Sequence, residues 1–93
     1  MLTVNAYFDG RVKSIGFEDT EGRVTAGVME AGEYTFSTGS PEHMFVVTGA
    51  LVVKRPEDAD WTTFPAGESF HVPGGTSFEV KVEQPTAYVC RYR

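Results

Sequence analysis

The chain has 93 residues, a formal net charge of −5 and 41% hydrophobic residues, with 10 glycines and 5 prolines spread along its length. This length predicts one domain over residues 1–93, with a groove or barrel mouth as its site rather than a deep multilayer core. The eight lysines and arginines are scattered, so the acidic chain lacks the basic stripe that nucleic-acid binding needs. Small-molecule ligands are therefore expected.

The single cysteine, Cys90, excludes an intrachain disulfide. The N-terminal residues lack the basic and apolar regions of a signal peptide, and no apolar run approaches the ~20 residues of a transmembrane helix. We therefore expect a soluble cytoplasmic protein without membrane partners.

The first half of the chain alternates short apolar runs with turn residues, and no window keeps helical spacing. After Tyr7 and Phe8 an Asp-Gly turn leads to a strand over 11–17, and a polar turn follows at 19–22. Residues 23–38 predict a hairpin that turns at 30–32. A Gly-Ser-Pro corner then opens a strand over 42–48.

The second half continues the same pattern. Thr48 and Gly49 predict the tip of a tight hairpin that leads into a strand over 50–54, and Pro56 with neighbouring acids ends it. Further strands are expected at 61–64, 69–72, 76–82 and 86–92. About eight or nine short strands at this spacing predict an all-β sandwich or small barrel, such as a jelly roll.

Glu42 opens a strand face that Met44 and Val46 continue as apolar residues. An ionised Glu is seldom buried without a partner, so Glu42 is the first candidate site residue. A turn cap or a partner arginine across the sheet is the structural alternative. His43 and His71 alternate with inward residues and are expected to point outward, whereas Cys90 is expected to be a small buried residue.

Two spacings resemble the motifs of the cupin family of jelly-roll β-barrels. Glu42, six residues and Gly49 match the end of the first motif, and Gly67, five residues, Pro73, one residue and Gly75 match the start of the second. The family's metal-binding histidine positions fall on Phe36, Thr38 and Phe78. One carboxylate, one hydroxyl and two phenyl groups cannot form a divalent-metal cage, which predicts a cupin without a metal or other cofactor.

Five segments carry a closer likeness over essentially the whole chain: 5–8, 13–17, 32–38, 49–51 and 88–92. They resemble the small bacterial cupins known as pyrimidine/purine nucleoside phosphorylases. The resemblance implies reversible phosphorolysis of purine and pyrimidine nucleosides to a free base and ribose 1-phosphate, with inorganic phosphate as co-substrate. It also favours a homodimer, as cupins often are.

The chemistry so implied assigns roles to eight residues. Glu42 would hold the ribose or stabilise positive charge on the sugar, and Arg91 is the preferred phosphate clamp. Substrate-binding candidates are Lys13, Arg23, Tyr34, Phe36, Thr38 and Phe78, with the aromatic rings as a wall for the base. Each arginine could instead be a solvated strand residue, and the aromatic rings could serve only as core.

Two other functions remain open at this point. A non-catalytic sugar- or nucleoside-binding module on a degenerate cupin fits the same residues. A metal-dependent dioxygenase or isomerase fits less well, because Glu42 alone remains of four cupin ligands.

Overall fold

The computed structural model describes all 93 residues, Met1 to Arg93, and contains ten strands and no helix. No segment forms a helix that could span a membrane. The ten strands are β1 (Thr3–Tyr7), β2 (Val12–Asp19), β3 (Gly22–Met29), β4 (Gly32–Thr38), β5 (Glu42–Thr48), β6 (Ala50–Lys54), β7 (Thr62–Pro65), β8 (Ser69–Val72), β9 (Thr76–Val82) and β10 (Thr86–Arg91).

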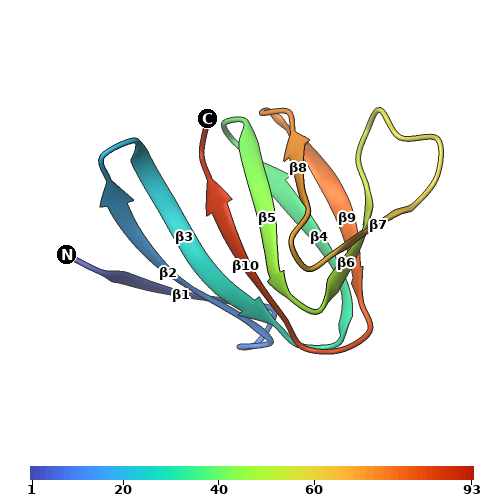
Figure 1. Ribbon diagram of the computed structural model, residues 1–93, viewed down its shortest axis with the longest axis horizontal. Helices are drawn as coiled ribbons and strands as arrows, with labels where there is room; N and C mark the ends of the chain where they lie inside the picture. The colour runs from blue at the N-terminus through green and yellow to red at the C-terminus, as the bar shows by residue number, and fades with distance from the viewer.

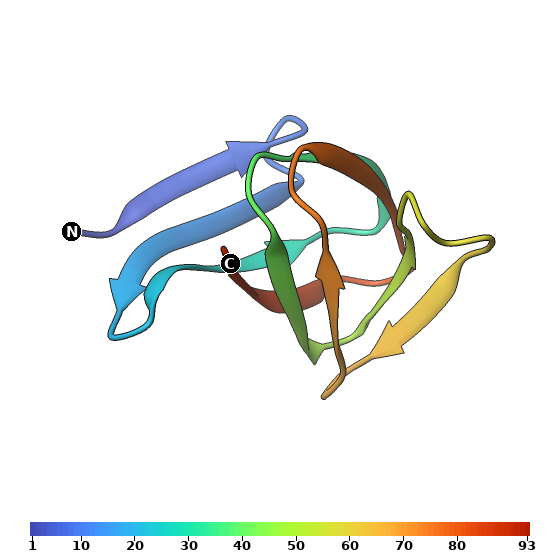
Figure 2. The same cartoon turned by 90° about the horizontal axis from the view of Figure 1, so that it is seen from above.

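The strands form two antiparallel sheets (Figure 1). The larger sheet has the order β1-β2-β3-β10-β5-β8 and the smaller has the order β4-β9-β6-β7. Seen from above, β1 and β2, in blue, extend beyond the rest of the molecule (Figure 2). The predicted all-β, cupin-type jelly-roll fold is confirmed.

The core fills the space between the sheets because each strand alternates inward and outward residues. Along β9, Phe78, Val80 and Val82 are buried while Ser77 and Glu79 are exposed, as the sequence predicts. On β5 the inward residues are Met44 and Val46. The core cluster comprises fourteen residues and includes Leu51 and Val53 from β6 and Phe70 and Val72 from β8.

Two predicted hairpins are wrong. Strands β3 and β4 do not pair, because β3 lies between β2 and β10 while β4 pairs with β9 in the other sheet. Likewise β5 and β6 lie in different sheets, so Gly49 is a corner between sheets and not a hairpin tip. Turn residues mark where a strand ends, but they do not say whether the chain returns beside it or crosses to the opposite sheet.

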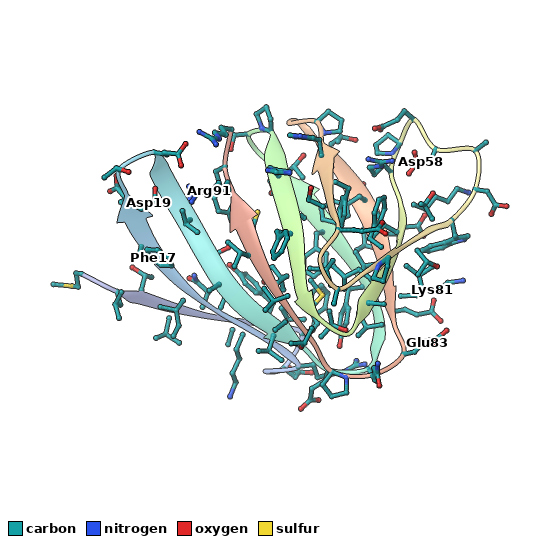
Figure 3. All side chains as sticks on the ribbon, viewed as in Figure 1. Phe17, Asp19, Asp58, Lys81, Glu83 and Arg91 are labelled. Atoms are coloured by element: carbon teal, nitrogen blue, oxygen red, sulfur yellow. The ribbon has the colours of Figure 1, made fainter.

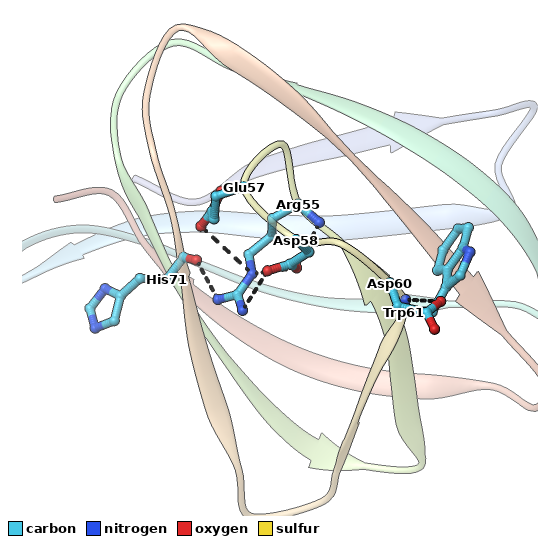
Figure 4. Close-up of polar contacts among 6 residues, drawn as sticks. All are labelled: Arg55, Glu57, Asp58, Asp60, Trp61 and His71. Carbon is cyan, nitrogen blue, oxygen red and sulfur yellow. Dashed lines mark hydrogen bonds and ion pairs between the residues drawn. The ribbon is translucent and has the colours of Figure 1, made fainter.

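The loop after β6 is fixed to β8 by Arg55 (Figure 4). Its guanidinium donates to both carboxylate oxygens of Asp58, at 2.9 and 3.2 Å, and to the backbone carbonyl of His71 at 3.0 Å. The same group lies over the rings of Phe64 and Phe70. Arg55 therefore stabilises the loop after β6 by joining it to β8 of the other sheet.

Candidate active site

A cavity of about 580 Å³ opens between the two sheets. The larger sheet contributes residues of β1, β2, β3, β5 and β10, and the smaller sheet contributes residues of β4 and β9. The turn between β1 and β2 covers one side. The sixteen lining residues are Tyr7, Phe8, Ser14, Arg23, Met29, Thr35, Phe36, Ser37, Gly39, Ser40, Glu42, Met44, Phe78, Tyr88, Cys90 and Tyr92.

Glu42 is the only carboxylate of the cavity. It is the first residue of β5 and shares the inward face with Met44 and Val46. Burial raises the pKa of Glu42 above its usual value, while the hydrogen bond from Cys90 and the positive charge of Arg23 act in the opposite direction. The alternative reading, a partner arginine across the sheet, is not found, since Glu42 forms no ion pair. The side chain of Glu42 accepts its one hydrogen bond from the Cys90 thiol, at 3.5 Å.

Cys90 is 2% exposed, as expected of a small buried residue. Burial raises the pKa of its thiol to about 12, and the neighbouring carboxylate of Glu42 adds to this effect. A neutral thiol is a donor and a poor nucleophile, so Cys90 orients Glu42 rather than attacking a substrate.

Arg23 is the only basic residue of the cavity. Its guanidinium carbon lies 4.6 Å from the centre of the Tyr92 ring, a cation–π contact that holds the side chain at the cavity wall. The Tyr92 hydroxyl lies 3.2 Å from the hydroxyl of Thr25, which fixes the ring in turn. One cation and one carboxylate thus face the same space.

Arg91, the predicted phosphate clamp, does not reach this cavity. Side chains alternate along β10, so Arg91 points to the outer face when Cys90 points inward. There it forms an ion pair with Asp19 at 2.7 Å and holds the pKa of that carboxyl at about 2 (Figure 3). The same alternation, applied to the predicted burial of Cys90, would have placed Arg91 outside from the sequence alone.

Three other candidates also lie away from the cavity lining. Lys13 is exposed on the outer face of β2, opposite Val28. Tyr34 is buried, and its hydroxyl donates to the backbone carbonyl of Glu30 at 2.6 Å. The buried Thr38 hydroxyl donates to the carbonyl of Pro73 at 2.7 Å and accepts from the Thr76 amide at 3.2 Å, so it holds a loop in place.

Phe36 and Phe78 do line the cavity, with ring centres 5.6 Å apart in a stacked arrangement. Sequence reasoning missed four further aromatic residues of the lining: Tyr7 and Phe8 at the turn after β1, and, on β10 or just after it, the two tyrosines Tyr88 and Tyr92. The two tyrosines follow from the alternation on β10, because Thr86, Tyr88 and Cys90 share the inward face and Tyr92 continues it. No periodicity in the sequence places Phe8, which belongs to a turn.

The positions that hold a metal in the cupin motif do not fit one here. Phe36 and Phe78 have no donor atoms, and the Thr38 hydroxyl is engaged by the backbone. No group of three His, Cys, Asp or Glu side chains in the structure is arranged to hold a metal ion. Glu42 alone supplies a suitable oxygen.

Known proteins match the chain over its whole length. The family model of pyrimidine/purine nucleoside phosphorylase matches residues 2–92. A protein of that name from Aliivibrio fischeri is 59% identical over 92 residues, which cover 99% of each chain.

Solved structures give the same picture of the fold. A protein of unknown function from Vibrio parahaemolyticus is 55% identical and superposes with a TM-score of 0.96, over 100% of this chain and 99% of the other. The EutQ protein of Clostridium difficile shares the fold at 16% identity, with a TM-score of 0.70 over 85% of this chain and 59% of the other. With the family model matched from residue 2 to residue 92, the chain belongs to the pyrimidine/purine nucleoside phosphorylase family.

Proposed function

We propose that this protein is a nucleoside phosphorylase that transfers the pentosyl group of a nucleoside to inorganic phosphate. The observation that carries the proposal is that Glu42 and Arg23 line one aromatic-walled cavity as its only carboxylate and its only cation. Membership of the family supports the same reaction.

In the proposed reaction, an oxygen of phosphate forms a bond to C1′ of the ribose as the bond between C1′ and the base nitrogen breaks. The electron pair of the broken bond goes to the base, which takes up a proton from solvent. Positive charge develops on the sugar, and the carboxylate of Glu42 is suited to stabilise it. Arg23 replaces Arg91 as the proposed phosphate-binding residue, because its guanidinium lines the same cavity.

The aromatic wall of Phe36 and Phe78 supports broad tolerance of the base. Stacking uses the π-face that purines and pyrimidines share. No Asn or Gln side chain lines the cavity, so its wall lacks the carboxamide groups that form paired hydrogen bonds with the edge of one particular base. Both nucleoside classes are therefore proposed as substrates.

We propose that no metal ion or other cofactor takes part. The donor set around Glu42 supports this, since the three remaining cupin positions offer two phenyl rings and an engaged hydroxyl. Activity that survives prolonged chelation is the expected result, and activity lost on chelation and restored by one divalent metal would contradict it.

The experiment that tests the function uses purified full-length protein with uridine or adenosine, with and without phosphate, after treatment with a chelator. Chromatography is expected to show equal amounts of free base and ribose 1-phosphate, and only when phosphate is present. Absence of phosphate-dependent base release would overturn the proposal. Nucleoside binding by calorimetry without turnover would identify a non-catalytic binding module instead.

We also propose a cytoplasmic homodimer. The lone, buried thiol of Cys90 suits a reducing compartment. Across the outer face of the larger sheet, an apolar row joins neighbouring positions of five strands: Val4, Ile15, Ala26, Val89 and Phe45. Three of these, Val4, Ile15 and Phe45, are exposed, as expected of a surface that a second copy covers.

Sedimentation equilibrium of wild-type protein is expected to give twice the mass of one chain, and Ile15→Glu is expected to give a folded monomer. A wild-type monomer at micromolar concentration would contradict the homodimer.

A further inference from the structure

The turn between β1 and β2 adopts a backbone conformation that its side chains disfavour. Phe8 and Asp9 have φ values of 54° and 57°, the only positive values at non-glycine residues in the chain, and Gly10 continues with 82°. Left-handed backbone is unfavourable for L residues, and for a bulky one such as phenylalanine it is uncommon. Such outliers gather at binding sites, where the surrounding contacts hold them.

The turn is held by two backbone hydrogen bonds and by aromatic contacts. Gly10 donates to the carbonyl of Tyr7 at 3.1 Å, and Arg11 donates to that of Phe8 at 3.2 Å. The Phe8 ring lies 4.9 Å from the ring of Tyr34 and 5.5 Å from that of Phe36, between ring centres. These contacts direct Phe8 toward the cavity that it lines.

Burial of an apolar side chain does not account for this arrangement, because Phe8 remains 41% exposed. Its ring instead extends the wall formed by Phe36 and Phe78 out to the cavity mouth. Tyr34, the aromatic residue predicted for this wall, is buried behind Phe8 and bonded to Glu30. An exposed aromatic face at the mouth of a cavity suits a flat, apolar partner ring.

We propose that Phe8 binds the base of the nucleoside by stacking, as a specificity-determining residue of the site; this inference rests on the proposed phosphorylase function. Phe8 reads the flat face of the base and makes no contact with phosphate. Purines have the larger ring system and gain more from this contact than pyrimidines.

The test compares Phe8→Leu with Phe17→Leu, since Phe17 is partly exposed on β2, opposite Val24, and does not line the cavity. Phe8→Leu is expected to raise KM for adenosine roughly 5- to 100-fold, from the usual effect of losing one base–aromatic stack. KM for uridine should rise less, and KM for phosphate should not change. Phe17→Leu should leave all three values at the wild-type level.

Two further variants separate stacking from folding. Phe8→Tyr retains a flat aromatic ring on which a base can stack, so KM for adenosine is expected to stay within about twofold of wild type. Phe8→Gly relieves the left-handed backbone, which offsets part of the stability lost with the ring contacts to Tyr34 and Phe36. It should therefore remain folded and still show the raised KM for adenosine.

Unchanged nucleoside KM values in Phe8→Leu, with an active wild-type enzyme, would overturn the role of Phe8 and leave the proposed function standing. A wild-type protein without phosphate-dependent base release would overturn the function itself. A raised KM that accompanies loss of the dimer by sedimentation would assign Phe8 to the subunit interface and also contradict the inference.

Discussion

Glu42 lies among apolar residues without an ion-pair partner, and its carboxylate is only partly compensated by the Cys90 thiol and by the charge of Arg23. Such an arrangement costs folding free energy, because burial disfavours the ionised form. Residues that lower stability in this way are typical of functional sites. The cost in folding free energy at Glu42 therefore agrees with a catalytic role for this residue rather than a packing role.

Replacement of Glu42 by glutamine is expected to stabilise the fold in a pH-dependent way. The folded-state pKa of Glu42 lies above its usual value, so wild-type stability falls as pH rises through the usual value of 4.5 toward the raised one. The neutral amide of the Glu42→Gln variant has no such loss, and its oxygen can still accept from Cys90. Urea unfolding should show the variant more stable than wild type at pH 8 and no such gain at pH 4. Lower stability of the variant at pH 8 would make Glu42 a structural residue.

Arg23 and Arg91, which lie on the neighbouring strands β3 and β10, are expected to differ in their contribution to phosphate binding. Arg23→Ala should raise KM for phosphate roughly 10- to 100-fold, the usual consequence of losing a charged hydrogen-bonding partner. Arg91→Ala should leave it unchanged, because Arg91 is paired with Asp19 on the outer face. Steady-state kinetics at varied phosphate concentration measure both values. A larger effect from Arg91→Ala would place the phosphate site on the outer face.

Strand alternation made part of the site predictable at the level of single elements. It placed Phe36, Glu42 and Phe78 inward and His43 and His71 outward, and the structure confirms each position. It failed where the chain leaves the strands. The left-handed turn at Phe8 has no periodic signature, because φ values of this kind are stabilised by contacts with Tyr34 and Phe36 that are distant in sequence.

Gly49 allows the chain to pass from β5 in one sheet to β6 in the other. Its φ is +80°, and a Cβ atom would collide with the hydroxyl oxygen of Thr86. That buried hydroxyl lies 2.9 Å from the carbonyl of Gln84 and accepts from the amide of Ala50 at 3.2 Å, so it cannot move without breaking these bonds. Glycine is therefore required at position 49 for two reasons: the left-handed backbone conformation, and the lack of room for a Cβ atom beside Thr86.

Gly49→Ala is expected to lower the free energy of unfolding by ~2–4 kcal/mol, since strain and collision act together. Gly67→Ala is the matched control: its φ is also positive, at +91°, but no atom lies within 4 Å of the added Cβ. Gly67→Ala should lower the free energy of unfolding by only ~1 kcal/mol, because only the strain of the left-handed backbone acts there. Urea unfolding of both variants measures the difference, and equal losses would show that contact with Thr86 is unimportant.

At the scale of the whole molecule, the fold class and family were predictable, but the pairing of strands was not. Turn signals at 30–32 and 48–49 are compatible with a hairpin or with a crossing between sheets. The crossing goes with the position of β10 between β3 and β5, a pairing of residues far apart in the chain that no local turn signal specifies. This crossing brings β4 and β9 opposite β3 and β5, and so creates the cavity that Arg23 and Glu42 both line.

The central claim is that this cavity performs phosphorolysis with Glu42 as its charge-stabilising group. The most direct measurement is kcat/KM for uridine at saturating phosphate, compared between wild type and Glu42→Gln. We expect the variant to lose at least ~100-fold, a typical effect of removing one electrostatic group from a transition state, while remaining folded. A folded variant with wild-type kcat/KM would contradict the claim and place the chemistry elsewhere in the molecule.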